Sequence, residues 1–562
     1  MIIKSFLMLL ILILPASNYS QESTINNNYN FKLSDIKYEK LVSLGVEDSE
    51  VNSNLSNIFL NQSYDSIKEF LSSLPVTSSN HLVQRLIYKI LISQYNLGDD
   101  QLTDEEDQTL FEIKISKLFD TARFVEIDKI YSKTPPEYEN DRINLKKIEA
   151  FFLRNEYRNG CEFLQKRDSK KSHIFGKFNI ICNIINEDFE RARFNISLLK
   201  EKNIPGDNIF IDLCYNIMGD LNISKSKLKS ENLEQISTLN PILLSSLQIA
   251  EISPNFEHIK NATSSTLTFI LSSPSSTSEI KLYTAEKLIV QKRIKDEMLA
   301  EIYQLTSFEQ EEINNALKEY KTQSPVRARS LLYQAIINED NRDLKFQLIK
   351  ALLKQSKTDK LFASISYLVK DSISYENLKN LSFEDKNLIL DIFISVNEYE
   401  KMEEFLTLHC FENGELNKKF LLKVVSLNLI KHIEKGVYFD VTELKNLFDE
   451  FLLNQKDLIQ IKNIILISSL IIDLDEVLIN KITKINRISR PEEIEINASN
   501  IVANLNFLEK KKYFNNLYAI FGILENKNID ELNSVQLYLI LKIFKDLEFE
   551  EEFKILAKKL LL

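Results

Sequence analysis

The sequence predicts an all-α protein, a right-handed superhelical solenoid of antiparallel helical hairpins with no significant β-sheet. Apolar residues recur with the period of an α-helix along almost the whole chain. Only 9 glycines and 10 prolines occur in 562 residues, so few positions interrupt a helix. Similar helical units also recur, and the chain is far longer than one hydrophobic core usually serves.

The clearest repeat unit spans residues 186–203, NEDFERARFNISLLKEKN. Asp188 stands where a side chain can cap the first free backbone N–H groups of a helix. We expect a preceding helix over residues 173–185 to pack antiparallel across the turn. The apolar residues follow i, i+3, i+7, i+10 spacing, which places them on one helix face: Phe189, Ala192, Ile196 and Leu199.

The residue that follows each such turn recurs at a nearly constant interval. In the first series the interval is 32 or 33 residues, at Phe124, Tyr157, Phe189 and Leu221. In the second series it is 36 to 39 residues, at Leu361, Tyr399, Val437, Leu474, Tyr513 and Phe549. Such intervals indicate two-helix repeats, which bury a continuous core by stacking on one another.

Two stretches carry a resemblance to a known superfamily. The turn-aromatic-x-x-small pattern of NEDFERARF (186–194) and the stretch SPVRARSLLYQAI (324–336) resemble tetratricopeptide-like hairpins. The repeats lack the Trp near the start of the first helix and the Pro that closes the second, so the resemblance is to the α-solenoid superfamily. The order of the hairpins also resembles secreted helical proteins of alphaproteobacteria, a resemblance that implies no activity.

The intervals and the composition divide the chain into segments. We expect a signal peptide over 1–20, a polar lead with the first helices over 21–60, and hairpin repeats over 61–222. Residues 223–280, rich in Ser and Thr, are expected to form an irregular joint before the longer repeats of 281–562. The last stretch, LEFEEEFKILAKKLLL, is an apolar helix that we expect to dock on another surface.

The first twenty residues have the layout of a secretory signal peptide. Lys4 precedes an apolar run from Phe6 to Leu14, and small polar residues follow. We expect cleavage after Ser20 and a periplasmic or secreted location, with an uncleaved anchor as the alternative. Since the longest later apolar run, residues 464–472, is far shorter than a bilayer span, we expect no integral membrane segment after signal removal.

Four cysteines would then meet an oxidising compartment. Cys161 and Cys182 lie at equal distances from the polar stretch 166–173, which could turn two antiparallel helices and bring the thiols together. The two cysteines could form a disulfide. It is equally consistent with the sequence that both stay unpaired and pack as small buried hydrophobic residues. Cys214 and Cys410 have no obvious partner in the sequence.

The charge balance argues against nucleic acid as a partner. The formal net charge is −11, and no basic stripe offers a surface for a phosphate backbone.

The motif search predicts no catalytic residue, no cofactor and no metal. HExxH, CxxC, GxGxxG, P-loop, GxSxG and EF-hand patterns are all missing from the sequence. His409 and Cys410 lie near Glu412 in the sequence. Because adjacent helical side chains point about 100° apart, they would not converge on one metal ion, and we interpret His409 and Cys410 as structural residues. The Glu-Ser, Gly-rich and Ala-Tyr-Asn motifs of lytic transglycosylases, some of which are exported α-superhelices, are also missing.

The sequence therefore favours an exported, non-catalytic α-solenoid scaffold or adaptor that binds a protein, a peptide or an envelope polymer. Two alternatives stay open at this point. One is a cell-wall-active enzyme, similar to a lytic transglycosylase, with an unrecognised site. The other is a structural or self-assembling component of the envelope.

Overall fold

The computed structural model describes residues 40–46, 53–97, 102–166, 172–220, 239–357, 360–373, 381–412, 415–454, 457–488, 513–524 and 529–561. The expected signal peptide lies outside these residues, as do 21–39 of the polar lead and 223–238 of the expected joint. Residues 40–562 form one compact unit.

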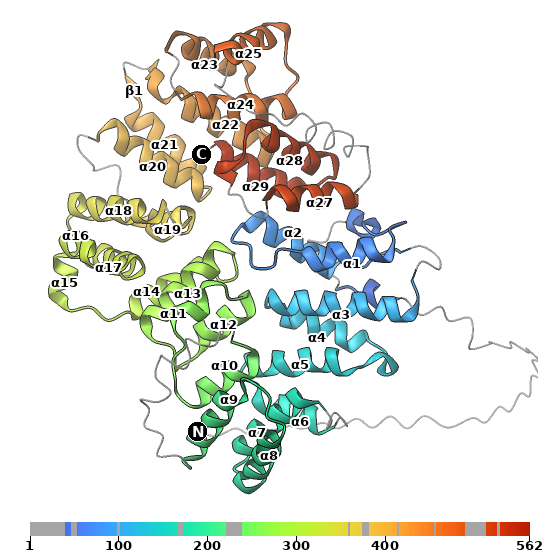
Figure 1. Cartoon of the computed structure of the whole chain (residues 1–562). Helices are drawn as coiled ribbons and strands as arrows, with labels where there is room; N and C mark the ends of the chain where they lie inside the picture. The colour runs from blue at the N-terminus through green and yellow to red at the C-terminus, as the bar shows by residue number, and fades with distance from the viewer. Residues whose placement is uncertain are drawn as a thin grey trace, which may run out of the picture. The chain divides into compact units, whose positions relative to one another are not determined.

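The described residues are mostly helical, which confirms the predicted all-α class (Figure 1). The β-structure among them is one small antiparallel hairpin, β1 (Phe411–Glu412) and β2 (Glu415–Leu416). Up to residue 218 the helices are α1 (Tyr64–Ser73), α2 (His81–Ile92), α3 (Asp104–Asp120), α4 (Phe124–Lys133), α5 (Asp141–Leu153), α6 (Tyr157–Gln165), α7 (His173–Ile185), α8 (Phe189–Glu201) and α9 (Asp207–Met218).

The remaining helices continue the same pattern to the end of the described chain. Between 239 and 373 they are α10 (Pro241–Ile249), α11 (Phe256–Lys260), α12 (Ser264–Ser272), α13 (Ser278–Val290), α14 (Asp296–Leu305), α15 (Gln310–Asn314), α16 (Ala316–Glu319), α17 (Pro325–Asn338), α18 (Arg342–Lys357) and α19 (Phe362–Val369). Beyond 380 they are α20 (Phe383–Ser395), α21 (Tyr399–His409), α22 (Leu421–Lys435), α23 (Val441–Asn454), α24 (Leu458–Ile471), α25 (Glu476–Ile488), α27 (Tyr513–Leu524), α28 (Ser534–Asp546) and α29 (Glu550–Leu561).

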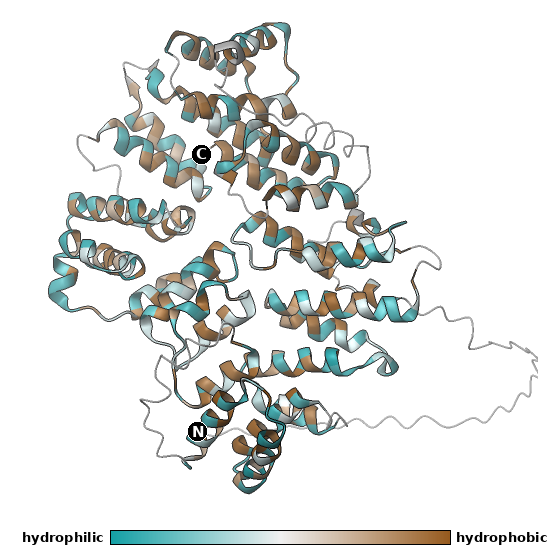
Figure 2. Ribbon diagram, viewed as in Figure 1, coloured by the Kyte–Doolittle hydropathy of each residue, from teal (hydrophilic) through white to brown (hydrophobic). Residues whose placement is uncertain are grey.

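Helices that follow one another pair as hairpins, and hairpins stack on their neighbours. The pairs α5–α6, α7–α8, α12–α13, α17–α18, α20–α21 and α28–α29 are all in contact. Helices two places apart, such as α1 with α3 and α23 with α25, also touch. This pattern of local contacts is that of stacked repeats, in which each amphipathic helix hides its apolar face against neighbours (Figure 2).

Several hairpin turns share one backbone motif although they lack glycine. In the α7–α8 turn Glu187 has a φ of 60°, while Asp188 N–H donates to Asn183 O at 2.9 Å and Glu187 N–H to Ile184 O at 3.0 Å. These two bonds satisfy the last carbonyls of the first helix, which is the Schellman arrangement. A positive φ and the same pair of backbone hydrogen bonds recur in the turns at Ala122, Asn155, Asn397 and Glu548.

The second helix of a hairpin lies in close contact with the first at Gly160, the fourth residue of α6. A β-carbon there would lie 2.9 Å from the ring of Phe152 in α5, so only glycine fits this contact. In the next hairpin the equivalent position holds Ala192, which is fully buried. Gly160 and Ala192 thus occupy the small-residue position of the turn-aromatic-x-x-small pattern.

The described part of the expected irregular joint, residues 239–280, is instead mostly helical, because it contains α10, α11, α12 and the start of α13. Several of its Ser and Thr residues are helix caps or are buried within helices. Thr263 caps α12 and Thr277 caps α13 through their side-chain oxygens, while Ser264 and Ser265 are buried.

The last helices of the unit pack on the first ones. In the core between α1 and α27 the ring centroid of Phe70 lies 5.0 Å from that of Phe514 and 5.9 Å from that of Phe521. The apolar helix α29, which we expected to dock on a surface, packs on α2, α22, α24 and α28 (Figure 1). None of the helices within the described residues is both long and apolar enough to cross a bilayer.

Candidate functional site

Two adjoining cavities lie where segments distant in the sequence meet. The larger cavity has a volume of about 770 Å³ and the smaller cavity about 570 Å³, which are sizes typical of ligand sites. Ser79, Val290 and Lys360 line both of them. The walls come from the loop before α2, from α11 to α13 and from the starts of α17 and α19, and α29 adds to the smaller cavity.

A buried ion pair forms part of the wall of the larger cavity. Arg329 of α17 is 2% exposed, and its Nε donates to Glu286 Oε1 of α13 at 2.7 Å. The hydroxyl of Tyr303, in α14, donates to the same carboxylate oxygen at 2.7 Å. Burial, with the charge of Glu286, raises the pKa of Tyr303 well above its ordinary value, so the hydroxyl stays a donor. This network fixes α13, α14 and α17 relative to one another.

Two further charged side chains of the larger cavity, Glu279 and Lys287, form hydrogen bonds with neutral groups. Ser324, at the start of α17, donates its hydroxyl to Glu279 Oε1 at 2.8 Å. Lys287 Nζ donates to the carbonyl of Ile259 at the end of α11, at 3.2 Å. Burial lowers the pKa of Lys287, and the nearby charge of Lys260 adds to this shift.

The smaller cavity is markedly basic. Among its described lining residues five lysines face one acid, Asp391. That carboxylate already accepts a hydrogen bond from Lys423 Nζ at 2.6 Å. The lysines come from three parts of the chain: Lys292, Lys357, Lys360, Lys558 and Lys559. The arrangement can hold an anionic group next to apolar side chains.

His81, the first residue of α2, also lines the smaller cavity. Burial, together with the positive charges of Lys292 and Arg85, lowers the pKa of its imidazole from 6.5 to about 4. Glu552 opposes this shift. His81 is therefore neutral near pH 7 and can offer one N–H donor and one acceptor nitrogen.

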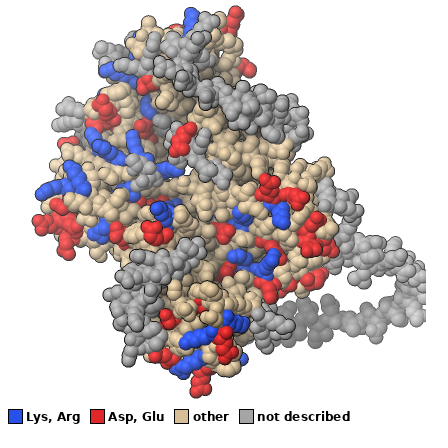
Figure 3. All heavy atoms as spheres, viewed as in Figure 1, with Lys and Arg blue, Asp and Glu red and all other residues tan. Residues whose placement is uncertain are grey.

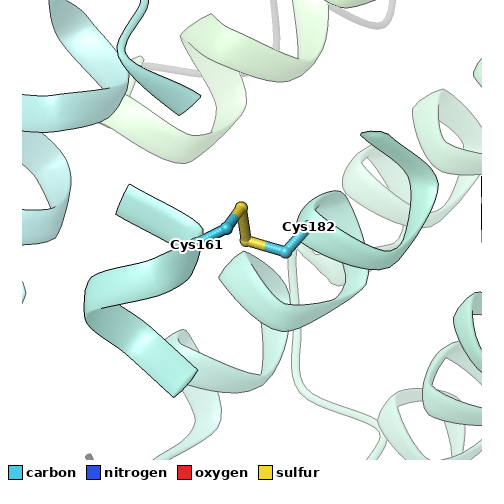
Figure 4. Close-up of a disulfide and its surroundings, with 2 residues drawn as sticks. All are labelled: Cys161 and Cys182. Carbon is cyan, nitrogen blue, oxygen red and sulfur yellow. A yellow bond between two sulfur atoms is a disulfide. The ribbon is translucent and has the colours of Figure 1, made fainter. Parts of the chain in front are cut away.

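The structure joins the two cysteines that the sequence singled out. Cys161 of α6 and Cys182 of α7 form a disulfide with their Cα atoms 5.6 Å apart (Figure 4). Cys214 lies in the same apolar cluster as this disulfide, and burial raises the pKa of its thiol. Cys161 and Cys182 lie outside both cavity walls, so this bond belongs to the framework rather than to the candidate site.

The remaining pair of residues that the sequence analysis considered, His409 and Cys410, lies at the C-terminal end of a helix. His409 is the last residue of α21 and Cys410 follows it as the C-cap, almost fully buried. Burial raises the pKa of the Cys410 thiol to about 11. Within the part of the chain that the structure describes, no three His, Cys, Asp or Glu residues are grouped as a metal site would require.

No sequence pattern pointed to either cavity, because the charged residues come from separate segments, spread over 100 positions in the larger cavity and over more than 250 in the smaller one. The face drawn in Figure 3 gives no hint either, since basic and acidic side chains are mixed over it. Comparison of the chain with protein-family models, with curated proteins and with solved structures found no match.

Proposed function

We propose that the protein is an exported, non-catalytic α-helical scaffold that binds a protein, a peptide or an envelope polymer. The observation that carries this proposal is the pair of adjoining cavities built from the first, middle and last helices. Their walls combine apolar side chains with a few charged groups, which is the usual composition of a binding site. The resemblance to tetratricopeptide-like hairpins, which present surfaces for ligands, supports the same function.

Export is supported by two independent features. The first twenty residues have the signal-peptide layout described above, and Cys161 and Cys182 are paired. Structural disulfides persist in the oxidising compartments outside the cytosol.

A binding function without catalysis is supported by the state of the acids in the cavity walls. Glu286 is held by Arg329 and Tyr303, and Asp391 by Lys423. Glu279 accepts the hydroxyl of Ser324. A carboxyl group that acts as a general acid or base must reach the substrate, and these three are already bound to neighbours.

Site-directed photo-crosslinking in the producing cell tests where the ligand binds. A benzophenone amino acid would replace Thr77 in the larger cavity or Ala363 in the smaller, and Val125, 59% exposed on α4, would serve as the control position. We expect a discrete adduct from at least one cavity position and none from the control. Adducts from Val125 alone, or from all three positions equally, would contradict a binding role for the cavities.

A second assay separates this function from its enzymatic alternative. The purified protein would be incubated with peptidoglycan and the soluble fraction analysed for released muropeptides. We expect no release above a heat-denatured control, and release by the native protein would defeat the proposal.

A further inference from the structure

The lysines of the smaller cavity stand out against the composition of the chain. The whole sequence has 81 acidic and 70 basic residues, whereas the described wall of this cavity has five lysines and one aspartate. Because Asp391 is already paired with Lys423, it neutralises none of the five directly. Lys292 Nζ lies 3.6 Å from Asp296 Oδ1, but the wall as a whole carries an excess of positive charge that favours an anionic ligand.

Three of these lysines make contacts that leave their charge uncompensated. Lys360 Nζ donates to the hydroxyl of Ser79 at 3.1 Å, and Lys357 and Lys558 lie over the rings of Phe362 and Tyr399. None of the three forms an ion pair with an acid that the structure describes. Burial lowers the pKa of Lys558, partly opposed by the charge of Glu434, as expected for an ammonium group held away from water.

Backbone groups add to the positive field of the smaller cavity. The first residues of α2 and of α19 line it, so the positive ends of two helix dipoles face the same space. The N-cap of α19 is Leu361, whose side chain cannot accept from the free amides of the first turn. Such amides bind carboxylate or phosphate oxygens readily.

Apolar side chains lie beside each group of lysines. Ile289 and Val290 precede Lys292, Phe362 follows Lys360, and Ile555 is one helical turn before Lys558 and Lys559. A ligand that contacts all three groups of lysines therefore needs several acidic groups as well as apolar ones. A peptide can meet this requirement, whereas a fatty acid, with one charged end, cannot.

We propose that the smaller cavity binds an acidic peptide segment in which carboxylate side chains alternate with apolar ones. Lys357, Lys360 and Lys558 hold the carboxylates, and the first turn of α19 offers its free amides to one of them. The ligand continues into the larger cavity past Ser79, Val290 and Lys360. This inference rests on the proposed binding function and specifies its ligand.

Fluorescence anisotropy with synthetic peptides tests the inference. The probe is a fluorescein-labelled peptide of sequence Glu-Leu-Glu-Ile-Asp-Phe-Glu, and its counterpart has Gln and Asn in place of the acids. The variant K357Q/K360Q removes two cavity charges. The matched control K129Q/K202Q removes two charges from exposed positions on α4 and at the end of α8, outside both cavities.

We expect the acidic peptide to bind the native protein and the control variant equally, and K357Q/K360Q at least about tenfold more weakly. The amide counterpart should bind at least about tenfold more weakly than the acidic peptide. Equal weakening in both variants, tight binding of the amide peptide, or no binding of the acidic one would each overturn the inference. Displacement of the peptide by pyrophosphate at equal or lower concentration would overturn it in favour of a phosphate ligand.

These outcomes are separable from a failure of the proposed function. If crosslinked adducts form through the cavity while the acidic peptide does not bind, the ligand class is wrong and the binding function stands. If no cavity position gives an adduct, or muropeptides are released, the binding function itself fails.

Discussion

The buried carboxylate of Glu552 in α29 accepts a hydrogen bond from Arg85 Nε in α2 at 2.8 Å, across 467 positions of sequence. Lys89 Nζ, one turn further along α2, lies 2.7 Å from the same oxygen. Glu552 has no exposed surface, and Lys89 is 6% exposed. One acid from the last helix therefore compensates two cations of an early helix, and this joins the two ends of the stack.

Replacing Glu552 by Gln should destabilise the fold by about 3 kcal/mol or more, because two cations would stay in a site that no longer holds their counter-ion. Urea unfolding followed by circular dichroism measures this loss. The control is E551Q, since Glu551 is 57% exposed in its pair with Lys554 and should contribute less than about 1 kcal/mol. Equal effects of the two substitutions would show that the contact between α2 and α29 is weak.

The disulfide should be present in exported protein. Intact mass should rise by two hydrogens on reduction, while Cys214 and Cys410 remain thiols in both states. Replacing Cys161 and Cys182 together by Ala should cost roughly 3 kcal/mol, since the bond closes a loop between residues 21 apart. Four free thiols in protein recovered from the medium or periplasm would refute the pairing.

Gly160 and Gly176 make a matched pair for substitution by Ala. At Gly160 the new β-carbon would meet the Phe152 ring at 2.9 Å, so we expect a loss of about 1–3 kcal/mol. At Gly176, inside α7, nothing lies within 4 Å, and Ala should stabilise the fold by about 0.5–1 kcal/mol. Thermal unfolding would measure both, and opposite signs are the expected result.

Glycine should be preferred at the turn position of Glu187. Its φ of 60° is strained for a residue with a β-carbon, so E187G should raise stability by about 0.5–1 kcal/mol. The control is E190G in the first turn of α8, where glycine should cost a similar amount. A destabilised E187G would mean that the Glu187 side chain makes a contact worth more than the backbone strain.

Stability should fall as the pH drops from 6.5 towards 4, partly because of His81. Its folded pKa of about 4 lies below the unfolded value of 6.5, so the unfolded chain takes up the proton first and acid favours unfolding. Since each pKa unit is worth about 1.4 kcal/mol, the native protein should lose about 2–3 kcal/mol more than H81Q over this interval. Urea unfolding of both proteins at several pH values measures the difference, and parallel pH profiles would contradict it.

The helical hairpins could be predicted from the sequence because their information is local. Tyr157, Phe189 and Tyr399, chosen as residues that follow a turn, are the first residues of α6, α8 and α21. The expected helix over 173–185 is α7, and Asp188 caps α8 by accepting from Arg191 N at 3.2 Å. Periodicity and caps act within a few residues, so one sequence suffices to find them.

The joint and the cavities could not be predicted, for different physical reasons. Ser and Thr are common in loops and also at helix caps, and only the surroundings of Thr263 decide between these roles. The cavities depend on contacts such as that of Lys360 with Ser79, across 281 positions. No local pattern encodes such a contact, because it forms only when stacked hairpins bring distant segments together.

The junction between α2 and α29 also governs how the molecule should come apart. A linear array with free ends can fray from either end, one repeat at a time, and its interior can outlast its edges. Here α2, an early helix, and α29 shield each other, so loosening one exposes the apolar surface of both. We therefore expect cooperative disassembly, in which the cavities vanish in the same step as the contact between α2 and α29.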